Sequence, residues 1–213
     1  MKRNSGFFLI LIGIALVLSG LGLAVYNFWD QERAGEEAQA VLEELVDYIP
    51  ETKPMVLPEV MDDLPDLQEI EYPNFVLNPK MDMPIQEING IEYVGYVEIP
   101  ALELKLPVIS NWSEFGANIA PCRYVGTAYM DNMVICGHNF STHFGRLNTL
   151  NPGDLIYFRD MDGNRFVYRA VEFEVLKPTD IEAMCIGEWD LTLFTCTLGG
   201  QTRFTVRCEK FDQ

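Results

Sequence analysis

The sequence has very few histidines and lacks cysteine pairs with zinc-finger spacing. It contains only two histidines, His138 and His143, and none of its five cysteines has the spacing of a zinc-finger pair. Structural zinc sites draw four Cys and His ligands from closely spaced pairs, so such a site is disfavoured. An odd number of cysteines leaves at least one thiol unpaired. We expect one reactive thiol and four structurally ordinary ones among Cys122, Cys136, Cys185, Cys196 and Cys208.

Basic residues are also scarce. The chain has 15 Lys and Arg against 32 Asp and Glu, a formal net charge of −17. Residues 30–93 alone hold 17 of the acidic residues and three of the basic ones. Nucleic-acid binding needs a basic surface that displaces counterions from phosphate, so we expect no nucleic-acid partner. A solvated acidic spacer is the simplest interpretation of residues 30–93.

Charge is missing altogether from Phe7 to Tyr26. These twenty residues would span about 30 Å as a helix, the thickness of the bilayer hydrocarbon. Two basic residues precede the stretch and acidic residues follow it, which predicts a single-pass anchor with a cytoplasmic N-terminus and the bulk of the chain outside the cytoplasm. A cleaved signal peptide is the competing interpretation, but its apolar core would be shorter, and no small-residue cleavage site follows.

An acidic segment with helical periodicity comes next and stops at Pro50. Its apolar stripe predicts either a juxtamembrane stalk helix or a helix that packs on the folded domain. The stripe consists of Ala38, Val41, Leu42, Leu45, Val46 and Ile49. Residues 50–84 contain seven of the twelve prolines, which predicts an extended linker, with a lid over the active-site groove as the alternative.

The folded domain is expected to begin near Ile91. Short alternating strands with turn residues between them, and little helix, predict an all-β fold that closes into a barrel. The strands are expected at 93–99, 102–106, 133–136, 155–158 and 166–176, with a Ser113-capped helix to Asn118 and a helix whose face is Phe144, Leu147 and Leu150. We therefore divide the chain into a cytoplasmic stub and anchor (1–29), a juxtamembrane helix and linker or lid (30–90), and a catalytic barrel (91–213).

The clearest local feature is the stretch Asp190–Glu209, in which two alternating runs flank Gly199-Gly200. A two-residue turn at these glycines makes a β-hairpin whose opposed residue numbers sum to 399. Cys196 then lies opposite Arg203, with about 5 Å between their Cβ atoms. One face is expected to be core and the other open: the core face carries Leu191, Leu193, Thr195, Phe204, Val206 and Cys208.

A cysteine beside a guanidinium is a reactive environment, because a neighbouring cation favours the thiolate. A thiol nucleophile also needs a proton partner. His138 follows the apolar run 133–136, where a barrel would present it at the rim, so it is the candidate partner. His143, in a more polar stretch, is expected to be a surface residue or a contact at a helix start.

The residues now described resemble the sortases, the membrane-anchored cysteine transpeptidases of Gram-positive cell surfaces. Thr192–Cys196 reads TLFTC and fits the TLxTC signature of that family, with Arg203 on the following strand and Gly137-His138 after an earlier strand. Further similarity lies in 97–100 (VEIP), 106–108 (LPV) and 124–127 (YVGT). The resemblance covers Tyr93 to Phe211.

The resemblance implies an eight-stranded β-barrel and three catalytic residues. Cys196 would attack the Thr–Gly carbonyl of an LPxTG-like sorting signal, His138 would transfer protons, and Arg203 would stabilise the oxyanion or hold the substrate backbone. Thr195 corresponds to a position that contacts substrate, and the family needs no redox cofactor or catalytic metal. The implied partners are surface proteins or pilins with a C-terminal sorting signal, and an amine acceptor from a peptidoglycan precursor or a pilin lysine.

The subclass stays open at this stage. The stretch 137–139 and the expected 144–150 helix look class B-like, whereas the short turn after Cys196 and the absence of an Asp-Pro-aromatic lid motif do not favour the pilus-polymerising class. A calcium site is less favoured than a solvated acidic loop at Asp180, Glu182, Glu188 and Asp190. The alternatives in function are a hydrolytic cysteine endopeptidase on the same barrel and a catalytically silent surface-assembly module.

Overall fold

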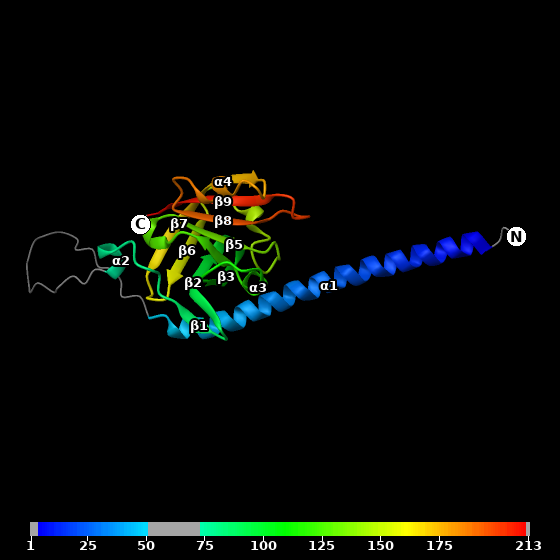
Figure 1. The fold of residues 1–213 in the computed structure, drawn as a ribbon, viewed down its shortest axis with the longest axis horizontal. Coiled ribbons are helices and arrows are strands. Elements are labelled where there is room, and N and C mark those ends of the chain that lie inside the picture. The colour runs from blue at the N-terminus through cyan, green and yellow to red at the C-terminus, as the bar shows by residue number, and fades with distance from the viewer. Residues whose placement is uncertain (1–3, 51–72, 212–213) are drawn as a thin grey trace, which may run out of the picture.

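The computed structural model describes residues 4–50 and 73–211 (Figure 1). These residues form an all-β domain with few short helices and one long N-terminal helix. The strands are β1 (Gln86–Ile88), β2 (Ile91–Ile99), β3 (Leu104–Ile109), β4 (Cys122–Val125), β5 (Met133–Gly137), β6 (Leu155–Asp160), β7 (Arg165–Leu176), β8 (Leu191–Cys196) and β9 (Arg203–Lys210). The helices are α1 (Asn4–Tyr48), α2 (Asn74–Leu77), α3 (Glu114–Ala117) and α4 (Ile181–Cys185), with single 3₁₀ turns at Pro100–Leu102, Ala128–Met130 and Leu147–Thr149.

The sheet closes into a barrel. Its strand order is β1-β2-β3-β4-β5-β8-β9-β7-β6, and the additional pairing of β2 with β6 joins the two sides, so eight strands close and β1 is an extra strand at the edge. Gly95 lies at this closure with φ +143°, and a Cβ there would stand 1.9 Å from the Arg159 carbonyl oxygen. Only glycine allows the strands to meet so closely. The expected eight-stranded barrel is confirmed.

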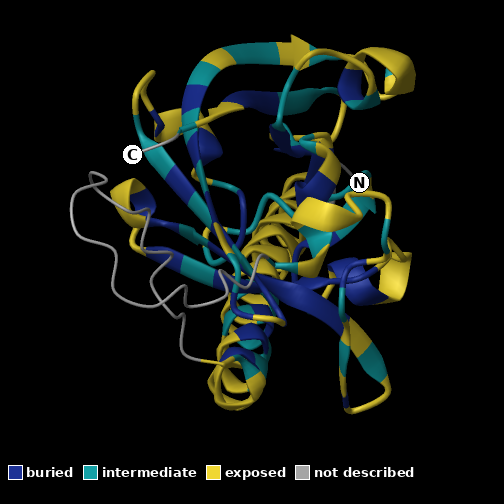
Figure 2. Ribbon diagram, turned by 90° about the vertical axis from the view of Figure 1, so that its left-hand side faces the viewer, coloured by how far each residue is buried: buried dark blue, intermediate teal, exposed yellow. Residues whose placement is uncertain are grey.

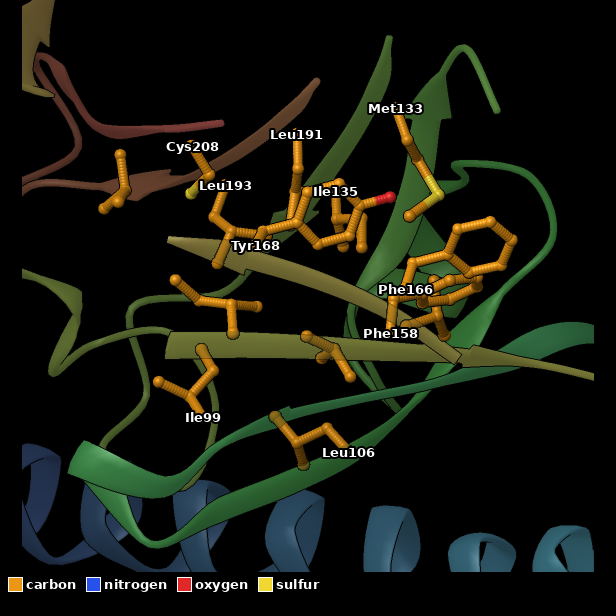
Figure 3. Packing of buried hydrophobic residues seen from close by; sticks show 14 of the residues in the cluster. Ile99, Leu106, Met133, Ile135, Phe158, Phe166, Tyr168, Leu191, Leu193 and Cys208 are labelled. Carbon is orange, nitrogen blue, oxygen red and sulfur yellow. The ribbon is translucent and has the colours of Figure 1, made fainter. Parts of the chain in front are cut away.

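The barrel interior is filled by alternate residues of the strands (Figure 3). Leu191 and Leu193 of β8 point inward with Val206 and Cys208 of β9, as the alternating pattern predicts. A second apolar cluster lies outside this core, between the barrel wall and the elements that cover it, and includes Phe194. The buried positions therefore lie on both faces of several strands (Figure 2).

The long helix α1 combines the two N-terminal segments that the sequence suggests. Its first half is exposed and apolar, and α1 is the one helix among the described residues that is long and apolar enough to cross a membrane. Its second half lies on the barrel beside β1 and β3 (Figure 1). Four residues at helical spacing are fully or almost fully buried there: Ala34, Ala38, Leu42 and Leu45. Of the two alternatives for the acidic helix, packing on the domain is the one observed.

The Pro-rich segment is described only from residue 73 onward, and residues 51–72, which include most of the expected linker or lid, lie outside the described residues. Phe75 in α2 stacks on Tyr129 with ring centroids 4.7 Å apart, and it also contacts Phe166. Tyr129 precedes β5, whereas His138 follows it, so α2 docks at the end of the barrel opposite to His138. The sheet itself begins at Gln86, five residues before the expected domain start.

Two local expectations have different outcomes. The Ser113 hydroxyl caps α3 by accepting a hydrogen bond from the Gly116 amide at 2.9 Å, as expected. The expected helix over 144–150 is wrong, because only a 3₁₀ turn forms at Leu147–Thr149. Residues 139–145 instead fold into tight turns, in which the Gly145 amide donates to the Phe140 carbonyl at 2.9 Å. Phe144, Leu147 and Leu150 are nevertheless buried.

Candidate active site

The pairing of β5 with β8 brings His138 and Cys196 to the same end of the barrel. These strands are parallel neighbours, with Cys136 opposite Phe194 and Gly137 opposite Thr195. His138 and Cys196 come next in this register. Adjacent strands lie about 4.8 Å apart, so His138, one residue beyond the end of β5, follows beside Cys196, the last residue of β8. Two residues 58 positions apart in sequence are thus neighbours at two carboxyl strand ends.

The hairpin register is confirmed in full. β8 and β9 pair so that Cys196 is opposite Arg203, Thr195 opposite Phe204 and Thr192 opposite Arg207. The connection is a four-residue loop rather than a two-residue turn: Thr197 N donates to Thr202 O at 3.0 Å, and Gly200 N donates to Thr197 O at 2.8 Å. Gly199 and Gly200 have φ of 86° and 72°. The longer loop keeps its midpoint between these glycines, so the register is unchanged.

Arg203 lies beside Cys196 through the strand pairing, and its side chain folds back over the loop. Its Nη1 atom donates to the carbonyl oxygens of Gly200 at 3.1 Å and of Thr202 at 3.2 Å. Both Cys196 and Arg203 are half-buried. The guanidinium is therefore held at the edge of the site by backbone carbonyls.

The rest of this sheet face is less open than expected. Arg207 is buried, with 3% of its side chain exposed, and its Nε donates to Glu174 at 2.7 Å. Its Nη1 donates to Thr192 Oγ1 and to the Met184 carbonyl, both at 3.1 Å. The segment that contains α4 covers the face here, so only the Cys196 end is accessible. The expectation of an open face is correct for that end alone.

His138 is half-buried and has two neighbours that sequence reasoning missed. Its Nε2 lies 3.1 Å from Asn118 Oδ1, and its ring stacks on Phe140 with centroids 4.9 Å apart and planes 25° apart. With the Asn118 amide oxygen facing the ring, this contact is a hydrogen bond in the tautomer that carries its proton on Nε2. Burial lowers the pKa of His138, and Asp30 of α1 opposes the effect. The neutral imidazole therefore predominates at pH 7.

Thr195 joins the two strand ends. Its side chain is buried, and its hydroxyl donates to the Gly137 carbonyl at 2.8 Å. This bond crosses from β8 to β5 directly behind Cys196 and His138. In the structure, the Thr195 hydroxyl thus holds together the backbones that carry both residues.

His143 is not a surface residue, which corrects the expectation. It is fully buried, and neither ring nitrogen has a hydrogen-bond partner in the part of the chain that the structure describes. Burial lowers the pKa of His143 to about 4. His143 is therefore a neutral, buried imidazole at pH 7, and His138 is the more exposed of the two histidines.

The remaining cysteines behave as structural residues. Cys136 and Cys208 are buried, as predicted, and Cys122 is buried as well. Burial raises the pKa of Cys122 to about 11 and also raises the pKa values of Cys136, Cys185 and Cys208. These four thiols stay protonated near neutral pH, which disfavours them as nucleophiles.

Neither a large groove nor a cluster of metal-binding side chains coincides with His138 and Cys196 in the described residues. One open groove of about 660 Å³ lies between α1 and β3, and another of about 370 Å³ lies beside α3. Neither is lined by His138 or Cys196. Within residues 4–50 and 73–211, no three His, Cys, Asp or Glu side chains gather as a metal site would require.

Comparison with known proteins agrees with this barrel. The sortase domain model matches residues 97–211, more than half of the chain. Sortase C1 from Streptococcus suis is 26% identical over 57% of this chain and 74% of its own, with a TM-score of 0.51. A search of curated proteins found no match.

Two further solved structures share the fold. Sortase C1 from Streptococcus agalactiae is 24% identical, with a TM-score of 0.52 over 60% of this chain and 72% of its own. A sortase D5 transpeptidase from Clostridium perfringens is 21% identical, with a TM-score of 0.51 over 60% of this chain and 83% of its own. These neighbours carry class C and class D names, so the subclass stays open. The match of the domain model over residues 97–211 shows that the chain belongs to the sortase family.

Proposed function

We propose that this protein is a membrane-anchored sortase that cleaves an LPxTG-like sorting signal and transfers the acyl fragment to an amine. The family and the fold support a cysteine transpeptidase in general. The observation that carries the specific proposal is the register of β5 and β8, which makes His138 and Cys196 neighbours at one barrel end. The pairing of Cys196 with Arg203 supports the same site.

The first half of the reaction forms a thioester. Neutral His138 accepts the proton of the Cys196 thiol, and the sulfur attacks the carbonyl carbon of the Thr–Gly bond. When the tetrahedral intermediate collapses, the C–N bond breaks and the imidazolium donates its proton to the leaving amine. The product is a thioacyl link on Cys196 and a free glycine amine.

The second half of the reaction releases the product. An acceptor amine attacks the thioester, a new amide C–N bond forms, and the C–S bond breaks. His138 takes the proton that the amine loses and returns it to the sulfur. Arg203 stabilises the negative oxygen in both halves or holds the substrate backbone, and Thr195 lies at the substrate-contacting position that the family resemblance implies.

The proposed substrates are surface proteins or pilins, and the proposed acceptors are amines of a peptidoglycan precursor or a pilin lysine. The apolar half of α1 supports a single-pass anchor, and the basic residues before it support a cytoplasmic N-terminus with the barrel outside. We retain the division into residues 1–29, 30–90 and 91–213 as a functional one, with α1 running through the first boundary.

Mass spectrometry of the full chain with a peptide library tests this function. An acyl fragment should appear on Cys196, and an added amine should release it as a ligated product. The Cys196→Ala variant should form neither species, whereas Cys185→Ala, at the other partly exposed cysteine, should form both. Cleavage without any ligated product would instead indicate a hydrolytic endopeptidase, and no adduct with any peptide would indicate a silent assembly module.

A further inference from the structure

The second half of α1 contacts the loop that follows His138. Gln31 makes three hydrogen bonds to this loop: its Oε1 accepts from the Ser141 amide at 3.1 Å and from the Ser141 hydroxyl at 3.2 Å. Its backbone carbonyl accepts from the Thr142 hydroxyl at 3.0 Å. The two segments are 110 residues apart in sequence, so only the tertiary fold joins them.

Gly35, one turn further along α1, makes the approach possible. A Cβ at this position would lie 2.8 Å from Cγ2 and 2.9 Å from Cβ of Thr142, closer than real Cβ contacts. Neighbouring Ala34 is fully buried. The helix backbone therefore lies directly against the loop, and the pair of Gly35 and Thr142 sets the distance between them.

A chain of ring contacts leads from this interface to the imidazole of His138. His143 directly follows Thr142 and is buried. Its ring centroid lies 5.6 Å from that of Phe140. Phe140 in turn stacks on His138 at 4.9 Å. On the inner side, Phe144 fills the space against Gly137, where a Cβ would stand 2.9 Å from the phenyl ring. The loop is thus clamped between the barrel and α1, and His138 lies at its start.

Asp30 adds a charge to the same interface. It forms an ion pair with Arg33 at 2.8 Å and is the acidic group that acts on His138. The helix therefore supplies hydrogen bonds, a close packing surface and a carboxylate to the loop that begins with His138.

We infer that residues Asp30–Gly35 of α1 are a positioning part of the active site, which holds the 139–144 loop so that the His138 imidazole keeps its working orientation. This inference rests on the proposed catalytic role of His138. The helix that is proposed to anchor the protein would then also complete its site. Small displacements of a catalytic group are costly, since a misplacement of about 1 Å can reduce a rate about a hundredfold.

A matched pair of glycine variants in the detergent-solubilised full chain tests the inference. Gly35→Ala should lower kcat for thioester formation about tenfold with little change in KM, and should shift the pH profile of kcat. Gly20→Ala makes the same substitution on the same helix, where no described atom lies within 4 Å of the new Cβ. It should leave kcat, KM and the pH profile unchanged. Both variants gain helix propensity, so helix stability cannot explain a difference between them.

A second set keeps the test decisive if Gly35→Ala fails to fold. Gln31→Ala removes the acceptor of the two Ser141 hydrogen bonds, whereas Gln31→Glu keeps an acceptor oxygen at that place. We expect the alanine variant to lose kcat and the glutamate variant to recover most of it. Gln39→Ala, whose side chain bonds only to the exposed Glu43 in the described residues, serves as the control.

The outcomes separate the two proposals. If His138→Ala retains activity, the proposed function is wrong. If His138→Ala is inactive while Gly35→Ala matches Gly20→Ala and Gln31→Ala matches Gln39→Ala, the function stands and the positioning inference is overturned. A loss of melting temperature with an unchanged kcat and pH profile for the folded fraction would also overturn it, because the contacts would then be structural only.

Discussion

Gly137 and Thr195 face each other across parallel strands β5 and β8, and the Thr195 hydroxyl donates to the Gly137 carbonyl at 2.8 Å. Each of these residues directly precedes a proposed catalytic residue. The hydrogen bond therefore couples the backbone positions of His138 and Cys196, which would otherwise depend on the strand ladder ending at this point.

Removal of that hydroxyl should affect both stability and rate. Thr195→Val keeps the shape of the side chain but leaves the half-buried Gly137 carbonyl without this donor, which should cost about 0.5–1.5 kcal/mol of the free energy of unfolding. Thr195→Ser keeps the hydroxyl and should lose less. Urea unfolding and the rate of thioester formation measure the two effects, and a valine variant as stable and active as the serine variant would contradict the coupling.

Arg203→Ala should slow acylation of Cys196 by about a hundredfold to a thousandfold, the usual effect of removing an oxyanion donor. A single-turnover experiment with a sorting-signal peptide measures the rate. Arg165→Ala is the control. Arg165 belongs to the β6–β7 hairpin rather than to the β8–β9 hairpin that carries Cys196, and it stacks over Tyr157 at 4.2 Å. Equal rates for the two variants would remove Arg203 from the proposed site.

Asp30→Asn should lower the pKa of His138 further. Burial already lowers this pKa and Asp30 raises it, so removal of the carboxylate takes away the opposing effect. Asp30 of α1 is the charged group that acts on the imidazole, and His143 of the same loop is electrostatically coupled to it.

An NMR titration of the His138 ring protons measures the effect of Asp30→Asn. Glu43→Gln, on the exposed face of α1, should leave the pKa unchanged. A His138 pKa that stays constant or rises in Asp30→Asn would show that α1 does not act on the imidazole electrostatically.

His143→Leu should make the fold less sensitive to acid. The folded-state pKa of His143 is about 4, below its ordinary 6.5, so the unfolded chain takes up a proton first as the pH falls. Stability is therefore lost between pH 6.5 and 4, by about 2 kcal/mol at pH 5. The leucine variant should lack this loss, because it buries no titratable nitrogen.

Urea unfolding of wild type and His143→Leu at pH 7 and pH 5 checks this effect. Other titratable groups lower the free energy of unfolding at pH 5 equally in both proteins, so the difference between the two proteins isolates the contribution of His143. If both proteins lose the same free energy between pH 7 and pH 5, the imidazole is not buried as described.

The hairpin and the buried faces follow from the sequence because their causes are local. Alternation with period two assigns the inward residues of a strand, and the symmetric Gly199-Gly200 pair centres the loop, so Cys196 meets Arg203 even though the loop is longer than expected. The Ser113 cap is local in the same sense. The TLFTC stretch, Gly137-His138, Arg203 and the shorter motifs at 97–100, 106–108 and 124–127 together indicate the family.

Other features depend on contacts between distant segments, which no local pattern encodes. The parallel pairing of β5 with β8 makes His138 a neighbour of Cys196, and the β2–β6 pairing closes the barrel that enforces it. The polar sequence around His143 predicts a surface residue. In the structure it is fully buried, because α1, from about one hundred residues earlier in the chain, covers it. The sequence alone predicts which residues are candidates for the chemistry, through residue type, strand period and the family signature. Only the tertiary structure decided which of them meet, because barrel closure and the docking of α1 bring together segments that share no local order.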